Sequence, residues 1–209
     1  MFTDSMRDDA LGQLPGFVAL IKAVTSMRAG TFTEADYTGY GTRPAITWGA
    51  AANTSPVGGR QRANDGLISF PQNTGSDSFA IAYVTNTAST AGTFKTMGFL
   101  DADPPIVGTA NDTTTEDIVA PAHGLATDQR VFVLASPGAL LPAGLAENTA
   151  YFVLAAGLTA DSFRVSASSG GAAINITAKG AAMFIPYTSQ TIAAGATPEL
   201  AIGAVVVQL

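Results

Sequence analysis

The chain has 209 residues, enough for one domain or two small ones with a buried core, and its lack of cysteine excludes disulfides, thiolate metal sites and cysteine nucleophiles. Charged residues make up 12% of the chain and hydrophobic residues 47%, with a net charge of -6. Nucleic acid is therefore not an expected partner, and a charge-poor surface of small side chains favours a non-enzymatic protein that is covered by copies or partners.

The first segment, residues 1–35, predicts an arm followed by one short helix. Apolar residues recur at spacings of three and four between residues 11 and 25, which is the period of an amphipathic helix. Pro15 is tolerated only in a first turn, so the helix is expected over residues 14–27, with Gly30 closing it. No positive leader precedes this segment, and its apolar stretch is shorter than a membrane span, so cytosolic synthesis and no membrane association are expected.

From residue 32 onward the sequence predicts a mainly β protein with a sandwich or jelly-roll-like architecture. Short apolar and β-branched runs alternate with turn residues at intervals of about 8 to 12 residues, and no helical segment separates them. The expected strands are residues 43–48, 66–70, 78–84, 92–100, 116–120, 130–135, 150–155, 162–167, 173–177, 182–186, 190–193 and 199–208.

Two boundaries divide this β-rich part of the sequence. Residues 101–111 contain two prolines and a glycine, and after Tyr187 the sequence resumes the style of the earlier part. We therefore expect a host domain of residues 36–110 plus 187–209, with residues 111–186 forming a small inserted β module. The alternative is a tandem pair of sandwiches, in which the final run belongs to the second module.

No constellation for enzyme catalysis is visible. His123 is the only imidazole, so it is the only candidate for the base of a hydrolytic triad, and no G-x-S-x-G elbow accompanies it. It lies in the turn-like sequence PAHGL, where a histidine that bonds the local backbone is the favoured interpretation. We expect no catalytic residues.

Metal and cofactor sites are not expected either. Two acidic groups could flank a calcium ion, but neither has the alternating oxygen ligands and glycine of a dedicated loop, so solvated turn acids are favoured. The glycine pairs of the chain join strand to strand, unlike a phosphate-binding loop between a strand and a helix. The acidic groups are Asp101 with Asp103 and Asp112 with Glu116 and Asp117, and the glycine pairs are Gly58 with Gly59 and Gly170 with Gly171.

Aromatic and basic side chains of the host segment suggest two kinds of surface. Tyr37, Tyr40 and Trp48 lie close together in sequence and would serve a carbohydrate-binding face if exposed, although core packing is the more common role. The basic residues Arg60, Arg62 and Lys95 are most simply interpreted as solvated surface groups, and the alternative is that they form ion pairs at the rim of a contact between subunits. Those ion pairs would join Arg60, Arg62 and Lys95 to Asp4, Asp8 and Asp9.

Several motifs resemble the small tail-fibre-like structural proteins of tailed bacteriophages. The run YTGYGTRPAITW over residues 37–48 is followed by a polar loop at 53–62, the strand end LISFP at 67–71, a Gly-containing turn at 87–99 and a closing strand pattern at 195–207. The central part is similar to a second phage virion pattern that begins H-G-L and continues with P-x-G-L, D-x-F and G-G segments. These lie at residues 123–131, 142–153, 161–166 and 170–177.

The resemblance covers residues 36–209 and implies a structural virion protein without catalytic residues. Its implied role is capsid decoration: binding and stabilising the major capsid shell, as a homotrimer, in a virion assembled in the bacterial host cytoplasm. The expected partners are the major capsid protein and copies of the chain itself. The alternatives are a tail, baseplate or fibre subunit that contacts tail proteins, and a host-attachment module that binds surface glycan.

Overall fold

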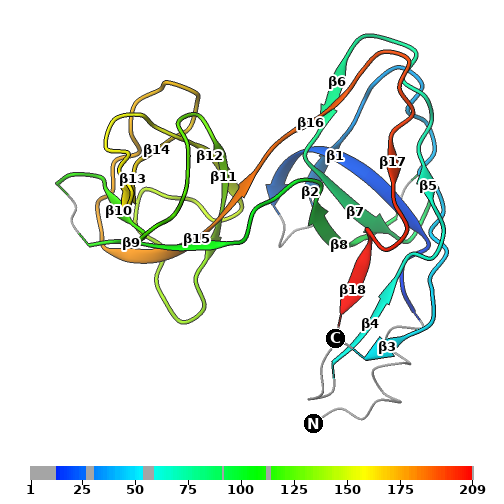
Figure 1. Cartoon of the computed structure of the whole chain (residues 1–209), viewed down its shortest axis with the longest axis horizontal. Coiled ribbons are helices and arrows are strands. Elements are labelled where there is room, and N and C mark those ends of the chain that lie inside the picture. The colour runs from blue at the N-terminus through cyan, green and yellow to red at the C-terminus, as the bar shows by residue number, and fades with distance from the viewer. Residues whose placement is uncertain (1–12, 27–30, 54–58, 91, 112–113, 209) are drawn as a thin grey trace. The chain divides into compact units, whose positions relative to one another are not determined.

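The computed structural model describes residues 13–26, 31–53, 59–90, 92–111 and 114–208, and these residues form strands with no helix (Figure 1). The strands pair in antiparallel sheets, so the prediction of a mainly β protein is confirmed. Many of these pairs join residues far apart in the chain, so the fold is held together mainly by non-local backbone pairing.

The predicted helix over residues 14–27 is wrong, because strand β1 occupies Phe17–Ser26. The consecutive residues Val18 to Ile21 are all buried, so the strand is covered on both faces and reads as a continuous apolar run. Such a run satisfies a helical spacing by coincidence, and its β-branched residues favour a strand. The arm, residues 1–12, lies outside the described residues.

Contacts divide the chain into two compact units. The first comprises Met1–Ala23, Thr33–Gly98 and Gln190–Leu209, and the second comprises Val24–Phe32 and Phe99–Ser189. The second unit begins before residue 111, because β9 (Ile106–Ala110), which the sequence placed in the host segment, pairs with β15 (Gly180–Tyr187).

A four-stranded sheet in the order β2-β1-β7-β8 is the largest sheet of the first unit. In β1, the residues from Phe17 to Ile21 pair with those from Asn86 back to Ala82, so the central strands run antiparallel. The other strands of this sheet are β2 (Thr31–Glu34), β7 (Ala82–Asn86) and β8 (Phe94–Phe99).

The last segment of the chain runs antiparallel to residues 61–80 in a nearly constant register. Gln190 lies opposite Ala80, Glu199 opposite Ser69 and Gln208 opposite Gln61. The pairing is interrupted twice, which yields three short pairs in place of one long ribbon. The pairs are β16 (Gln190–Ile192) with β6 (Ser78–Ala80), β17 (Glu199–Leu200) with β5 (Ile68–Ser69), and β18 (Val206–Gln208) with β4 (Arg60–Ala63), which also pairs with β3 (Ala52–Asn53).

Buried asparagines fill the two interruptions. The amide of Asn73 donates to the carbonyls of Ser76 and Ile192 at 2.8 and 3.0 Å. The amide of Asn64 donates to the carbonyls of Gly66 and Ala201 at 2.8 and 2.9 Å, and its Oδ1 accepts from the Val205 amide at 2.9 Å. These side chains replace the missing ladder bonds, so backbone groups buried at the breaks keep partners.

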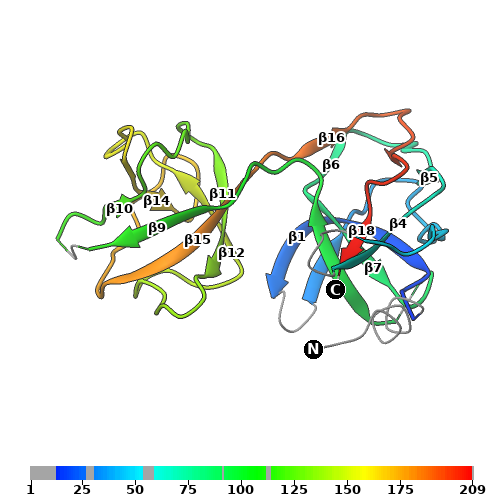
Figure 2. The same cartoon turned by 60° about the horizontal axis from the view of Figure 1, so that its bottom comes forward.

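The second unit is a nearly closed antiparallel barrel. Its strand order is β13-β10-β9-β15-β11-β12-β14, and Figure 2 shows the sheet curling round on itself. The two edge strands are separated in sequence by Arg164 alone, so one continuous segment forms both edges. The strands not yet bounded are β10 (Ile118–Val119), β11 (Arg130–Ala135), β12 (Thr149–Val153), β13 (Ser162–Phe163) and β14 (Val165–Ser166).

Large aromatic side chains fill the barrel. Phe163 and Phe184 are fully buried, and their rings meet edge to face with centroids 5.1 Å apart. Gly108 makes room for Phe184 and Ile118: a Cβ there would lie 2.5 Å from Ile118 Cγ2 and 2.9 Å from Phe184 Cε2. This glycine therefore belongs to a strand because of close packing, whereas the sequence suggested a linker.

Some strand predictions were confirmed and others were wrong. The expected strand at 130–135 coincides with β11, whereas residues 43–48 and 173–177 form isolated bridges in place of strands. Strands β1 to β4 and β9 were not predicted. The β9 segment follows two prolines and contains Gly108, which masked its strand character.

Candidate functional site

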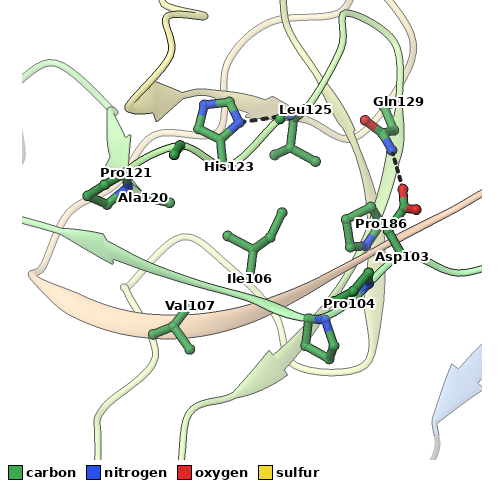
Figure 3. Close-up of a pocket in the computed structure, with 13 residues that line it drawn as sticks. Asp103, Pro104, Ile106, Val107, Ala120, Pro121, His123, Leu125, Gln129 and Pro186 are labelled. Atoms are coloured by element: carbon green, nitrogen blue, oxygen red, sulfur yellow. Dashed lines mark hydrogen bonds between the residues drawn. The ribbon is translucent and has the colours of Figure 1, made fainter.

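A cavity of about 550 Å³ opens on the second unit between the start of β9 and the turn after β10 (Figure 3). Its lining combines apolar side chains, including four prolines, with exposed polar groups. Polar groups come from one carboxylate, one amide and one imidazole. Residues 103–107 and 120–125 line it together with Gln129 and Pro186.

His123 is held on the cavity wall by the backbone. Its Nδ1 accepts the Leu125 amide hydrogen at 2.9 Å, and its Nε2 lies 3.3 Å from the Ser162 carbonyl oxygen. One nitrogen accepting and the other donating corresponds to the neutral Nε2-protonated tautomer. The ring also meets Phe163 edge to face at 5.1 Å. The prediction of a turn histidine that bonds the local backbone is confirmed.

A polar link closes one end of the cavity. Gln129 accepts the Ala126 amide hydrogen through Oε1 at 3.0 Å and donates from Nε2 to Asp103 Oδ2 at 3.4 Å. The Asp103 amide in turn donates to the Pro186 carbonyl at 3.0 Å. Figure 3 shows this link opposite the Pro121 wall. The site can therefore surround an apolar group and place a carboxylate at its edge.

Two of the acidic residues considered as calcium ligands lie beside an arginine. Asp117 Oδ1 accepts from Arg164 Nε at 2.7 Å, and Glu116 lies 3.9 Å from the same guanidinium. Hydrogen bonding to Asp117 raises the pKa of Arg164 further above its ordinary value. Asp112 lies outside the described residues. Within the described ranges, no three carboxylate or imidazole side chains gather as they would around a metal ion.

The paired glycines are placed in part. Gly170 adopts a positive φ of 63°, and the Gly171 amide closes a turn to the Ser168 carbonyl at 3.0 Å. The segment beyond this turn contacts β14 through a single bridge between Ser166 and Ala173, so the pair follows a strand but does not lead into a second one as predicted. Gly58 lies outside the described residues.

The aromatic group of the first unit is packed inward. Tyr37 is 5% exposed and donates its hydroxyl to the Pro71 carbonyl at 2.9 Å. Tyr40 meets Tyr37 edge to face at 5.2 Å and stacks on Phe70 at 6.4 Å. Trp48 is half-buried, with Nε1 donating to the Pro15 carbonyl at 2.9 Å. These rings pack within the unit and do not form an open face.

The basic residues of the first unit lie on different strands. Arg60 and Arg62 belong to β4 and Lys95 to β8. Arg60 Nη1 donates to Asn53 Oδ1 at 2.8 Å, while the Arg62 Nε is buried without a hydrogen-bond partner. Their predicted partners near the start of the chain lie outside the described residues, so the intersubunit ion pairs stay a prediction.

Sequence reasoning missed the ion pair of Arg43 with Glu34. Arg43 Nε donates to Glu34 Oε2 at 3.1 Å and Nη2 donates to Oε1, which is a bidentate arrangement. The Tyr40 hydroxyl donates to the same Glu34 oxygen at 3.2 Å. The two charges lie nine residues apart, in a segment that carried no periodic signal. Their pairing could therefore be seen only in the folded structure.

Alkaline pH is expected to destabilise the first unit through its buried tyrosines. Burial raises the pKa of Tyr37 to about 12, and burial together with the Glu34 carboxylate raises the pKa of Tyr40 further. A raised folded-state pKa gives stability that is complete below about pH 10 and is lost as the pH rises toward about 12. Urea unfolding at pH 8 and pH 11 should show the loss, and the Tyr37→Phe/Tyr40→Phe variant should lose less. An equal loss in both proteins would contradict the assignment.

Comparison with known proteins identifies no relative: no protein-family model, curated protein or solved structure matches this chain significantly. Among the described residues, no helix is long and apolar enough to span a bilayer.

Proposed function

We propose that this chain is a non-enzymatic structural protein of a tailed-bacteriophage virion, a decoration protein that binds the major capsid shell as a homotrimer. The observation that carries the proposal is a group of exposed apolar side chains held close together by one buried asparagine of the first unit. The second unit carries more of the negative charge. The motif resemblance of residues 36–209 to phage virion proteins supports the same role.

The second unit is the more negatively charged of the two. It holds eight acidic and four basic residues, a formal charge of -4, whereas the first unit holds eight acidic and six basic residues, a charge of -2. A surface with strong net charge stays soluble and repels copies of itself. The second unit is therefore suited to face solvent, and the first to face a partner.

The first unit exposes apolar side chains on segments joined by Asn64. Leu67, Ile202 and Val206 are 56%, 66% and 42% exposed, and we call them the Asn64 surface. Leu67 and Ile202 each follow a residue whose carbonyl accepts from the Asn64 amide. Exposed apolar side chains held on rigid backbone suit a binding surface, since little ordering accompanies burial.

Virions assembled in cells that supply variant chains would test the proposal. We expect the wild-type chain at a copy number commensurate with the major capsid protein, measured by quantitative mass spectrometry of purified particles. The variant Leu67→Asp/Ile202→Asp should lower occupancy about tenfold or more, because it buries charge at the contact.

The matched control is Leu140→Asp on the second unit, where Leu140 is 83% exposed. It should leave occupancy unchanged. Particles that lack the chain would overturn the proposal, and a few copies per particle would assign the chain to the tail. Equal losses from the control and the test variant would show that the Asn64 surface is not the contact.

A further inference from the structure

The ladder between β9 and β10 ends after one pair, Val119 with Thr109. Continuing the same register would place Pro121 opposite Val107, but proline has no amide hydrogen to donate. The chain turns at residues 121–122, where Ala122 has a φ of 52°. The Ala120 amide just before this turn donates to the Asp161 carbonyl at 2.9 Å, on the side of β10 that faces β13. The edge of β9 at Val107 is therefore left without a neighbouring strand.

The backbone of Val107 faces this open edge. In an antiparallel ladder, successive residues direct their amide and carbonyl groups to opposite sides. The backbone of Ala120 faces Asp161, so the backbone of the preceding residue, Val119, faces β9, where it pairs with Thr109. Val107 lies two residues before Thr109 on β9, so its backbone groups point to the same side as those of Thr109. On the other side of β9, the Ala181 amide donates to the Leu140 carbonyl at 2.9 Å and so points away from Thr109, in agreement.

The cavity lies directly at this edge. Ile106 lies within it, with Leu125 and Pro186 on its walls, and Asp103 lies at its polar end (Figure 3). The Val107 side chain beside it is 57% exposed. An open pair of backbone groups next to a hollow lined in part by apolar side chains is the arrangement by which sheets bind an extended peptide, where the backbone supplies affinity and the hollow supplies specificity.

We propose that this edge binds an extended segment of another protein, which adds as a strand beside Val107. One apolar side chain of the segment enters the cavity, and a lysine or arginine lies near Asp103. Charge complementarity selects such a partner, because residues 99–189 carry a net charge of -5. The same charge disfavours a second copy of this unit. The proposal is independent of the capsid role.

Titration of peptides into the isotope-labelled full chain, followed by NMR, tests the proposal. The probe is the acetylated and amidated peptide TKVLVKT. We expect saturable shifts at residues 104–107 and 120–125, about fivefold weaker binding for TEVLVET, and no saturation for TKVPVKT, whose proline interrupts the added strand. The absence of saturable shifts with TKVLVKT, or equal binding of all three peptides, would overturn the proposal.

The variant Val107→Pro removes the amide hydrogen that faces the open edge. The ladder to β15 should survive, because Ile106 and Gly108 carry its hydrogen bonds, and proline is tolerated where the amide faces outward. We expect TKVLVKT to bind about tenfold more weakly to this variant, and Val119→Thr to bind as the wild type does. Unchanged affinity in the folded Val107→Pro chain would overturn the proposal.

Amide hydrogen exchange in the unmodified chain gives an independent reading. The Val107 amide should exchange quickly in the free protein and at least tenfold more slowly with saturating TKVLVKT. The Gly108 amide should be protected in both states. Exchange at Val107 that the peptide leaves unchanged would overturn the proposal even if Val107→Pro does not fold.

Discussion

Replacing Arg43 by methionine is expected to lower the free energy of unfolding of the first unit by about 3 kcal/mol. Arg43 is 7% exposed and forms a bidentate pair with Glu34, so its removal leaves a partly buried carboxylate without its cation. Removing one partner of such a pair costs more than the pair itself contributes, because the remaining charge stays desolvated.

The guanidinium also ties down a distant loop. Its Nη1 donates to the Ala88 carbonyl at 3.0 Å, and its centre lies 5.4 Å from the centroid of the Phe94 ring. The Arg43 amide donates to the Ser89 carbonyl at 2.9 Å, and that bond survives the substitution. The variant should therefore loosen the connection between β7 and β8 while keeping the sheet.

Urea unfolding measured by probes in the first unit checks this expectation. The matched control is Lys22→Met, because Lys22 pairs with Asp36, whose side chain is 69% exposed. An exposed pair of this kind contributes about 0–1 kcal/mol, so the control should change stability little. Equal losses for Arg43→Met and Lys22→Met would show that burial of the Arg43 pair is not what stabilises the unit.

Replacing Phe184 by alanine is expected to destabilise the second unit by about 3–5 kcal/mol. Phe184 is fully buried on the central strand β15, and its ring contacts Phe163. The substitution leaves a cavity that Gly108 cannot fill, since Gly108 has no side chain to move into it. The loss should fall on the second unit, because the cluster around Phe184 lies within residues 106–184.

Hydrogen exchange measured for individual amides shows which of the two units is destabilised. Protection should fall in β9, β11 and β15, while protection in β1 and β7 stays as in the wild type. Val107→Ala is the control, because Val107 lies on the adjacent strand but is 57% exposed, and its stability change should stay within about 0.5 kcal/mol. A similar loss for both substitutions would contradict the assigned core.

Features that depend on a few neighbouring residues could be predicted from the sequence. The run RVFVLA at 130–135 forms β11 as expected, and the PAHGL turn holds His123 as expected, because β-branched and aromatic content and turn chemistry are properties of neighbouring residues. The run FVALI was predicted to be helical because the apolar residues in and around it also fit spacings of three and four. A segment buried on both faces carries no alternation that would distinguish a strand from a helix.

The β class, the absence of cysteine chemistry and the low charge of the chain follow from its amino-acid sequence alone. The folded chain was needed to show that Asn64 and Asn73 bridge the breaks beside the last segment, that Arg43 pairs with Glu34, and that β10 leaves Val107 uncovered beside a cavity. Most of these features join residues far apart in the chain, and all depend on the spatial register of paired strands. That register follows from packing of the whole core, and no local window of residues contains it.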